Sequence, residues 1–208
     1  MTGTPRTTTA TIPQREPVPA LVALSNATLP RRPAGARAAT AVDPFASHAA
    51  ALALVEPLGL SRELGSDELN DLRALAAEAG AIAEALIGRR PPSVRTLNRL
   101  AARTGVTETL RVEPDGTLTV VVHWHAETAV AELAHRLVEE LGRLDPARLR
   151  HCAREACDLL FYDTTRSRTQ RWHSESPCGN RERQDRFTAR SPASNRPADL
   201  QMRSGDRP

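Results

Sequence analysis

Proline interrupts every periodic pattern of apolar residues in the first part of the chain. Prolines stand at positions 5, 13, 17, 19, 30 and 33, among threonine, alanine and arginine. Neither a helical nor an alternating apolar repeat continues through them, so we expect residues 1–40 to be a disordered leader. We expect residues 191–208, at the other end, to be a disordered tail.

The next part of the chain carries apolar residues at helical spacing. A short Ala/Leu-rich helix is predicted over residues 48–56, a long amphipathic helix from its N-cap Ser66 to Gly88, and a third helix from Ser93 to Gly105. The apolar positions of the long helix are Leu69, Leu72, Leu75, Ala79, Ile82 and Leu86. This spacing places them on one face of the helix, which we expect to be buried.

Over residues 107–125 the apolar residues alternate with polar ones, which is typical of β-strands. They are Leu110 and Val112 in a first strand and Leu118, Val120, Val122 and Trp124 in a second. The string Pro114-Asp115-Gly116 between the two strands predicts a β-hairpin. Helical spacing returns from Val130 to Gly142.

Residues 45–144 therefore predict one small, mostly helical α+β domain with a β-hairpin. This domain contains no Gly-rich phosphate-binding loop and no nucleophile elbow, and no pair of nucleophile and base is visible in the chain. We therefore expect that the protein is not an enzyme. We expect the N-terminal domain to sense a signal or to form a homodimer.

The cysteines, Cys152, Cys157 and Cys178, fall within one stretch of 27 residues. Four of the six aromatic residues lie in the same part of the chain: Phe161, Tyr162, Trp172 and Phe187. A segment of about 40 residues is too short to be stabilised by burying apolar surface alone, and a metal ion is one of the few ways in which such a segment folds. We therefore expect a metal-binding module over residues 145–190.

The spacing of the candidate ligands is Cys152-x4-Cys157-x15-His173-x4-Cys178. Thiolate sulfur and imidazole nitrogen suit zinc, which takes four ligands tetrahedrally in structural sites. The sequence thus predicts one structural Zn²⁺ in a Cys3His site. His151, directly before Cys152, is an alternative fourth ligand, although the equal gaps of four residues favour His173. In a second alternative, the cysteines are inert free thiols in a small apolar core.

Arginine supplies all 28 basic residues of the chain, which carries 25 acidic residues and a net charge of +3. The guanidinium group suits bidentate contact with phosphate. Between Thr164 and Arg190 there are seven arginines and three acidic residues. The arginines are Arg166, Arg168, Arg171, Arg181, Arg183, Arg186 and Arg190.

A helix over residues 179–190, turning about 100° per residue, is expected to gather arginines on one side and carboxylates on the other. The arginines of this predicted stripe are Arg183, Arg186 and Arg190, and the carboxylates are Glu182 and Asp185. Beside a loop with further arginines, such a stripe predicts contact with the phosphate backbone of DNA. The alternative is an arginine-rich face that is merely solvated. We expect Trp172 and Phe187 to pack under the zinc site.

Several strings in this C-terminal part are similar to a known family. They are Cys152-Ala-Arg-Glu-Ala-Cys157, Leu-Phe161-Tyr-Asp163-Thr-Thr-Arg166-Ser-Arg168, Arg171-Trp172 and Cys178-Gly179-Asn180-Arg181. Together they resemble the CGNR zinc-finger family of bacterial proteins. In that family the finger follows an α/β domain called ABATE, and the proteins are described as candidate stress-induced transcription regulators. The order of elements over residues 45–144 is similar to that of the ABATE domain.

The resemblance implies a DNA-binding transcription regulator with a structural zinc finger. The family usually has cysteine where this chain has His173, which changes the formal charge of the zinc site from −2 to −1. It also usually has Asn-Thr where Val55 leads into Glu56-Pro57 here. The alternative function is a zinc-dependent protein-interaction or thiol redox-sensing module that does not contact DNA.

Neither membrane insertion nor export is expected. No stretch approaches the roughly 18 to 20 apolar residues of a transmembrane helix, and the first 30 residues lack the apolar core of a signal peptide. We therefore expect a cytoplasmic protein without a membrane partner.

Overall fold

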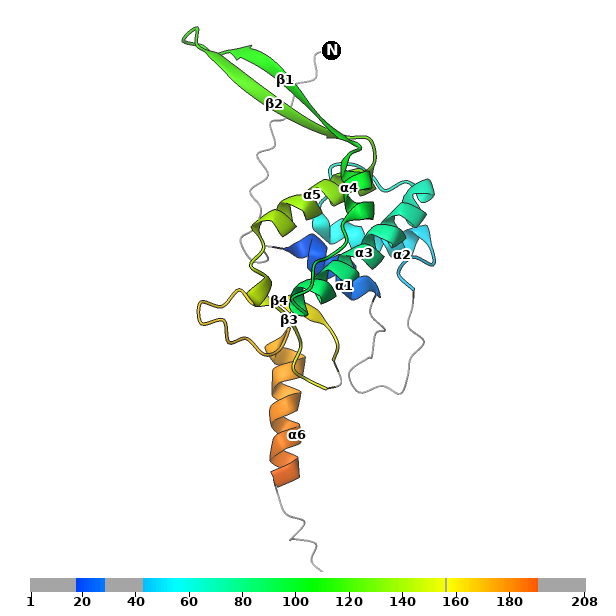
Figure 1. Ribbon diagram of the computed structural model, residues 1–208, viewed down its shortest axis with the longest axis vertical. Coiled ribbons are helices and arrows are strands. Elements are labelled where there is room, and N and C mark those ends of the chain that lie inside the picture. Colours follow the sequence, from blue (N-terminus) through cyan, green and yellow to red (C-terminus); the bar gives the residue numbers. More distant parts are fainter. Residues whose placement is uncertain (1–17, 29–42, 156, 191–208) are drawn as a thin grey trace, which may run out of the picture.

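The computed structural model describes residues 18–28, 43–155 and 157–190, and it confirms an α+β fold (Figure 1). The described elements are α1 (Pro19–Thr28), α2 (His48–Val55), α3 (Leu69–Ile87), α4 (Arg95–Ala101), β1 (Thr104–Val112), β2 (Leu118–Ala126), α5 (Ala129–Arg143), β3 (Leu149–His151), β4 (Leu160–Tyr162) and α6 (Asn180–Arg190). The strands form two antiparallel hairpins, β1–β2 and β3–β4. None of the described helices combines the length and the apolar character that crossing a bilayer requires.

Part of the expected disordered leader is a core helix, so the prediction for residues 1–40 is wrong at residues 18–28. Leu21 and Leu24 of α1 are fully buried against the other helices. Proline is compatible with this helix because Pro19 stands in its first turn, where a backbone N–H is not needed. Proline thus opens this ten-residue helix rather than interrupting it. The rest of the predicted leader and the predicted tail, residues 191–208, lie outside the described residues.

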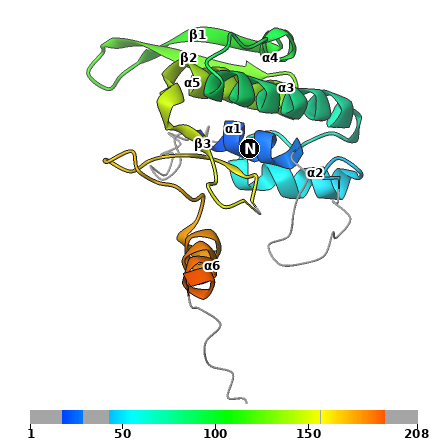
Figure 2. The ribbon, with the colours of Figure 1, turned by 60° about the horizontal axis from the view of Figure 1, so that its bottom comes forward.

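The helical core is built around α1, α3 and α5. α1 packs against α3 and contacts α2 on its other side (Figure 2). The largest fully buried apolar side chains are Leu21, Leu24, Leu72, Leu75, Ile82, Leu100, Leu133 and Leu137. The apolar positions of α3 recur every three or four residues, which confirms the helix predicted from the same pattern.

Two of the predicted helix ends are wrong, for local reasons. Ser66 is not an N-cap, because it opens a 3-10 turn in which the amide of Gly65 donates to Glu68 Oε2 at 2.7 Å. The third predicted helix ends at Ala101 rather than at Gly105, which lies in β1. Gly88 does cap the end of α3, as expected.

Carboxylates from neighbouring elements accept hydrogen bonds at the N-terminal ends of three helices. Glu140 of α5 accepts from the amides of Ala20 and Leu21 in α1, at 3.0 and 2.9 Å. Glu78 of α3 does the same for α4, and Glu68 for the first turn of α5. Each carboxylate satisfies amides that have no partner within their own helix and lies at the positive end of its dipole.

The second hairpin joins the helical body to the C-terminal part of the chain. Leu149 and Leu160 belong to the same buried core as the helices. The side-chain amide of Asn26 in α1 bonds both the amide and the carbonyl of Leu160, at 2.8 and 2.9 Å. His151 Nε2 lies 2.8 Å from Glu84 Oε1 of α3. The hairpin β3–β4 is therefore fixed to the body, and α6 extends away from it (Figures 1 and 2).

Candidate metal centre

Four side chains converge at the junction between the β3–β4 hairpin and α6. Cys152 directly follows β3, Cys157 and His173 lie in loops, and Cys178 lies in the irregular turn Glu175–Gly179 before α6. One ligand atom from each of the four lies within 4.8 Å of all the others, and Cys157 Sγ is 3.4 Å from His173 Nδ1. Tetrahedral zinc, with bonds of about 2.0 to 2.3 Å, holds its ligand atoms about 3.5 to 4 Å apart. The four atoms are therefore close enough to share one ion.

Backbone hydrogen bonds bring the two cysteine-bearing segments together. The amide of Cys152 donates to the carbonyl of Leu159 at 2.9 Å, next to the β3–β4 ladder. Ala153, the next residue, donates to the carbonyl of Arg171 at 2.8 Å and so holds the segment before His173 against the first cysteine pair. The convergence thus depends on the hairpin as well as on the spacing of the ligands.

His173, and not His151, completes the group. Both ring nitrogens of His151 have other partners: Nδ1 lies 3.2 Å from the carbonyl oxygen of Asp158, and Nε2 lies against Glu84. His151 therefore ties the metal-binding module to α3, and the choice between the two histidines that the sequence left open is resolved in favour of His173.

Burial shifts the pKa of Cys157, Cys178 and His173. It raises the pKa of the Cys157 thiol to about 12 and also raises the pKa of Cys178, whereas it lowers the pKa of His173. The histidine is thus held in the neutral form that binds a metal ion. The thiols become ligands only by losing their protons, so zinc binding is expected to release protons.

Arg154 supplies a buried positive charge beside the thiols. Its side chain is 12% exposed, and Nη2 is 3.7 Å from Asp185 Oδ2. Among the described residues, Nε and Nη1 have no hydrogen-bond partner. A largely buried guanidinium with two unpaired nitrogens, whose charge acts on the Cys178 thiol, fits a zinc–thiolate group with a net charge of −1, which would balance it. The donor set and this cation therefore both fit zinc, and zinc when bound would hold the two loops and α6 in one arrangement.

Asp163 organises the loop that follows β4, a role that the sequence analysis did not assign. This carboxylate is fully buried. Its Oδ1 accepts from the amide and the hydroxyl of Thr165, at 2.9 and 2.5 Å, and its Oδ2 accepts from the amide of Gln170 at 3.1 Å. Burial by itself raises the pKa of Asp163, but these hydrogen bonds hold it below the ordinary value. The signal in the sequence is Asp-Thr-Thr after a strand, where an Asp side chain commonly bonds the amide two residues on.

Two arginines before the first cysteine serve the same loop. Arg148 Nη1 donates to the carbonyls of Asp163 and Thr165, at 2.8 and 2.9 Å. Arg150 Nη2 donates to the carbonyl of Arg168 at 2.8 Å. Their guanidinium groups thus fix the backbone of the loop that carries the candidate DNA-contacting residues.

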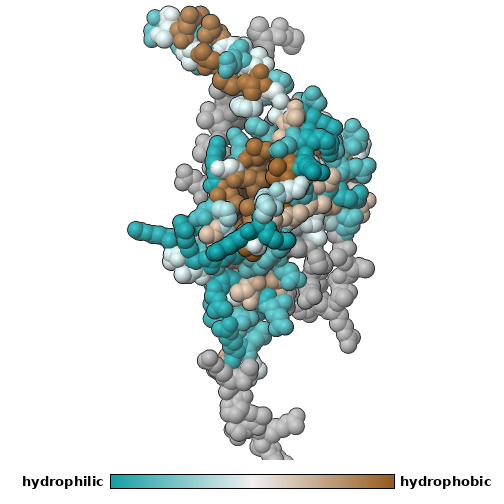
Figure 3. Space-filling view, viewed as in Figure 1, coloured by the Kyte–Doolittle hydropathy of each residue, from teal (hydrophilic) through white to brown (hydrophobic). Residues whose placement is uncertain are grey.

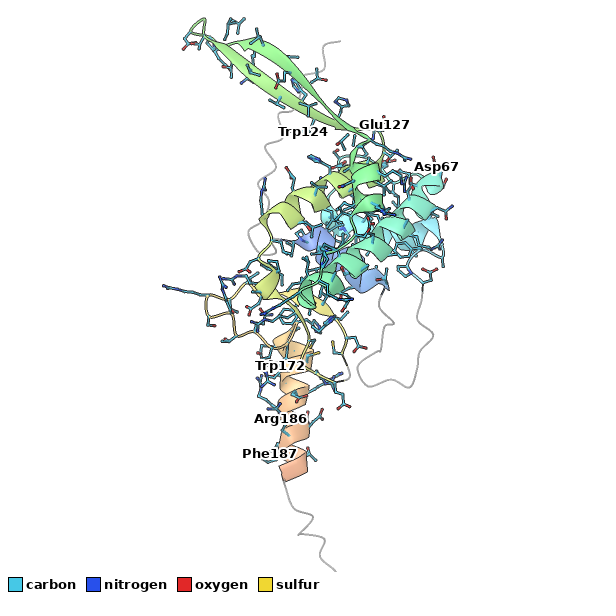
Figure 4. The ribbon with its side chains drawn as sticks, viewed as in Figure 1. Asp67, Trp124, Glu127, Trp172, Arg186 and Phe187 are labelled. Carbon is cyan, nitrogen blue, oxygen red and sulfur yellow. The ribbon has the colours of Figure 1, made fainter. Side chains whose placement is uncertain are left out.

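The candidate DNA-contacting arginines lie on this loop and on α6. The exposed ones are Arg166, Arg168, Arg171, Arg181, Arg183 and Arg186. The side chain of Arg190 lies outside the described residues. Arg171 and Arg183 lie over the ring of Trp172, at 5.4 and 5.6 Å from its centroid. The half-buried Trp172 thus links the loop to α6 (Figure 4).

Carboxylates accompany several of these arginines, so the predicted separation of charge on α6 is wrong for Glu182, whereas Asp185 pairs with Arg154 instead. Arg186 bonds Glu182 at 3.1 Å, because residues four apart lie on the same side of a helix. Arg183 bonds Glu175 at 2.7 Å. In the loop, Arg168 lies 3.3 Å from Asp145. The surface is rich in arginine, but it is a mixed surface rather than a bare basic stripe.

Phe187 does not pack under the zinc site as expected. It is 73% exposed on α6 (Figure 4). α6 contacts the preceding turn and, through Asp185, Arg154 of the first cysteine loop, but it extends away from the body (Figure 1).

Comparison with known proteins assigns this part of the chain. Residues 148–191 match the family model described as CGNR zinc finger. No curated protein matches the chain. Together with the convergence of Cys152, Cys157, His173 and Cys178, the family match assigns one structural zinc ion to this site.

Proposed function

We propose that this protein is a DNA-binding transcription regulator whose zinc finger contacts DNA. The observation that carries the proposal is the position of α6, which starts two residues after the ligand Cys178 and extends away from the body (Figure 1). Arg181, Arg183 and Arg186 of α6 are exposed, and the loop with Arg166 and Arg171 lies near its first turn. A rigid helix and loop with this composition can follow a phosphate backbone.

The ion pairs on this surface are compatible with DNA binding. In the pairs Arg183–Glu175 and Arg186–Glu182, more than half of each arginine side chain is exposed to solvent. Exposed pairs contribute about 0 to 1 kcal/mol each, so a phosphate can replace the carboxylate at little cost. Contacts with phosphates position a protein on DNA without selecting a sequence.

The zinc ion in this proposal is structural, and the protein is not an enzyme. Three thiolates and one imidazole complete a tetrahedral shell, so no position remains for a catalytic water. Following the resemblance of residues 45–144 to the ABATE domain, we further propose that the helical domain receives a stress-related signal in the cytoplasm.

Salt-dependent binding to duplex DNA tests the proposal. The zinc-loaded full chain is titrated into fluorescent duplex DNA at several salt concentrations. The double variant Arg166→Ala/Arg186→Ala is expected to bind more weakly, with a slope of log K against log salt that is lower by about 2. The matched control Arg95→Ala/Arg143→Ala removes two exposed arginines from the helical body and is expected to bind like the wild type. A zinc-loaded wild type without affinity for DNA at low salt would contradict the proposal.

The close thiols favour a second candidate, a redox-sensing or protein-interaction module. Cys157 is only half-buried, and its sulfur lies within 4.8 Å of the sulfurs of Cys152 and Cys178. A peroxide could oxidise two of these thiolates to a disulfide, with loss of zinc. Such a module without DNA affinity would show no salt-dependent binding, which distinguishes the two candidates.

A further inference from the structure

The β1–β2 hairpin carries an apolar face that is open to solvent. Seven side chains on this face are 44% to 68% exposed: Val106, Leu110, Val112, Leu118, Val120, Val122 and Trp124. They share one face because the register pairs Val106 with Trp124 and continues to Val112 opposite Leu118. Figure 3 shows these apolar side chains gathered on the hairpin, away from the helical body. We call this surface the hairpin face.

The opposite face of the same hairpin is polar. It carries Thr107, Thr109, Arg111, Thr119 and His123, with Val121 as its large apolar residue. Thr109 Oγ1 lies 3.2 Å from His123 Nε2 on this side. The separation of apolar and polar side chains is that of a sheet with one buried face and one face in water.

Only the base of the hairpin face touches the described part of the chain. The ring of Trp124 lies 4.5 Å from that of His135 on α5 (Figure 4). Val138, about one turn further along α5, is also 39% exposed, so the apolar surface continues from the hairpin onto the helix. An isolated two-stranded hairpin is marginally stable in water, and it gains stability by packing its apolar face.

The size of the hairpin face matches one half of a protein interface. With ordinary whole-residue areas, the seven residues expose about 700 Å². The largest apolar patch of a typical monomer is about 300–600 Å², and a stable interface buries about 800 Å² on each partner. The face is therefore larger than the apolar patch of a typical monomer and supplies most of the area that one side of a stable dimer interface buries.

The segments of this chain outside the described residues have little apolar surface to match the face. Residues 1–17, 29–42 and 191–208 contain few large apolar residues: Met1, Ile12, Leu29, Val42, Leu200 and Met202. They include no aromatic residue. Nucleic acid is also excluded as the partner, because Glu108 is the one charged residue on the face and it is acidic. A second copy of the chain, by contrast, brings an equally large apolar surface.

We propose that two copies of this chain associate through their hairpin faces. Packed face to face, two twisted sheets lie about 10 Å apart and bury their apolar side chains between them. The β2 residues form an unbroken apolar row from Leu118 to Trp124, so this row forms the centre and Glu108 on β1 lies toward the rim. The contact is two-fold symmetric and closes after two copies. It does not depend on DNA binding.

The mass of the full-length, zinc-loaded protein in solution tests the association. By light scattering or sedimentation equilibrium, the wild type is expected to have twice the 22.6 kDa of one chain. Val120→Glu and Leu118→Glu, which place a carboxylate in the central row, are expected to halve the mass. The matched control Thr107→Glu adds the same charge to the polar face and is expected to remain a dimer.

The outcomes separate this inference from the proposed function. All three positions are exposed, so circular dichroism is expected to show the wild-type helix content in every variant. The zinc content of Val120→Glu is also expected to be unchanged. A wild type with the mass of one chain would overturn the proposal, and so would a Val120→Glu variant that remains a dimer. A monomeric wild type that binds zwitterionic lipid vesicles would also overturn it, because the face would then bind a membrane. None of these results depends on whether the finger binds DNA.

Discussion

Arg154 lies close to the metal centre, and its effect on zinc affinity can be measured directly. Its guanidinium is buried, and Nε and Nη1 lack partners among the described residues. The positive charge of Arg154 lowers the pKa of Cys178, against the larger effect of burial, which raises it. Arg154 therefore favours the thiolate form of this ligand.

Replacing Arg154 by glutamine is expected to weaken zinc binding. The variant loses the charge that balances the thiolates, and changes outside the first ligand shell typically reduce metal affinity about 10- to 100-fold. Competition with a chromogenic chelator at fixed pH measures the change. Arg143→Gln, on the exposed side of α5, is the control and is expected to keep the wild-type affinity. An Arg154→Gln variant that holds zinc as tightly as the wild type would show that the guanidinium does not act on the metal centre.

The ligands could be predicted from sequence, whereas the groups that support them could not. The chain has only three cysteines and six histidines, and four of these residues stand at zinc-like spacing. Their chemistry therefore indicates zinc from the sequence alone. Arg154 and Asp163 look like ordinary charged residues in the sequence. Their burial results from the fold of the hairpin and loop around them. The contacts of His151 with Glu84 and Asp158, which exclude it as a ligand, likewise depend on the fold.

At the scale of elements, the helix α4 depends on a carboxylate of another helix. Its N-cap residue, Val94, offers no side-chain hydrogen bond. The amides of Thr96 and Leu97 donate instead to Glu78 of α3, at 3.0 and 2.5 Å. One carboxylate thus caps α4 and links it to α3.

Replacing Glu78 by alanine is expected to lower the free energy of unfolding by about 1 to 2 kcal/mol, because two amides of α4 lose their charged acceptor. Urea unfolding followed by circular dichroism measures the loss. Glu63→Ala, at an exposed position before α3, is the control and is expected to change stability by less than about 0.5 kcal/mol. If both variants unfolded at the same urea concentration, the cap would contribute nothing measurable.

Periodicity predicted the long helices and the first hairpin, because local spacing determines which face is apolar. It could not show that the hairpin face stays exposed, because alternation indicates an apolar face but not what covers it. It also missed α1, a helix of ten residues that begins with a proline and is stabilised by α3 and by Glu140. Whether an apolar face is covered, and whether a short helix such as α1 forms, depends on contacts between distant parts of the sequence.

At the scale of the whole molecule, the zinc site and the helical core have separate sources of stability. The buried apolar side chains of α1, α3 and α5 lie in the helical body and need no metal. The segment after Arg150 contributes few buried apolar residues to this core. The metal is therefore expected to stabilise the finger in particular.

Zinc removal by a strong chelator is expected to unfold the finger and to leave the helical body folded. Hydrogen exchange measured by mass spectrometry would then show loss of amide protection over residues 152–190, with protection retained in α3. Re-addition of zinc is expected to restore the protection, which controls for irreversible damage. Loss of protection throughout α3 would show instead that the two parts fold as one unit.

The position of α1 makes the start of the described chain essential to both parts. Leu21 and Leu24 fill the helical core, and Asn26 holds β4 through both backbone groups of Leu160. A truncated protein that begins after residue 42 would keep every zinc ligand and all seven candidate arginines. It would nevertheless expose the apolar surface of α3 that α1 covers, and β4 would lose its hydrogen bonds to Asn26. Exposed apolar surface and an unpaired strand edge both promote aggregation.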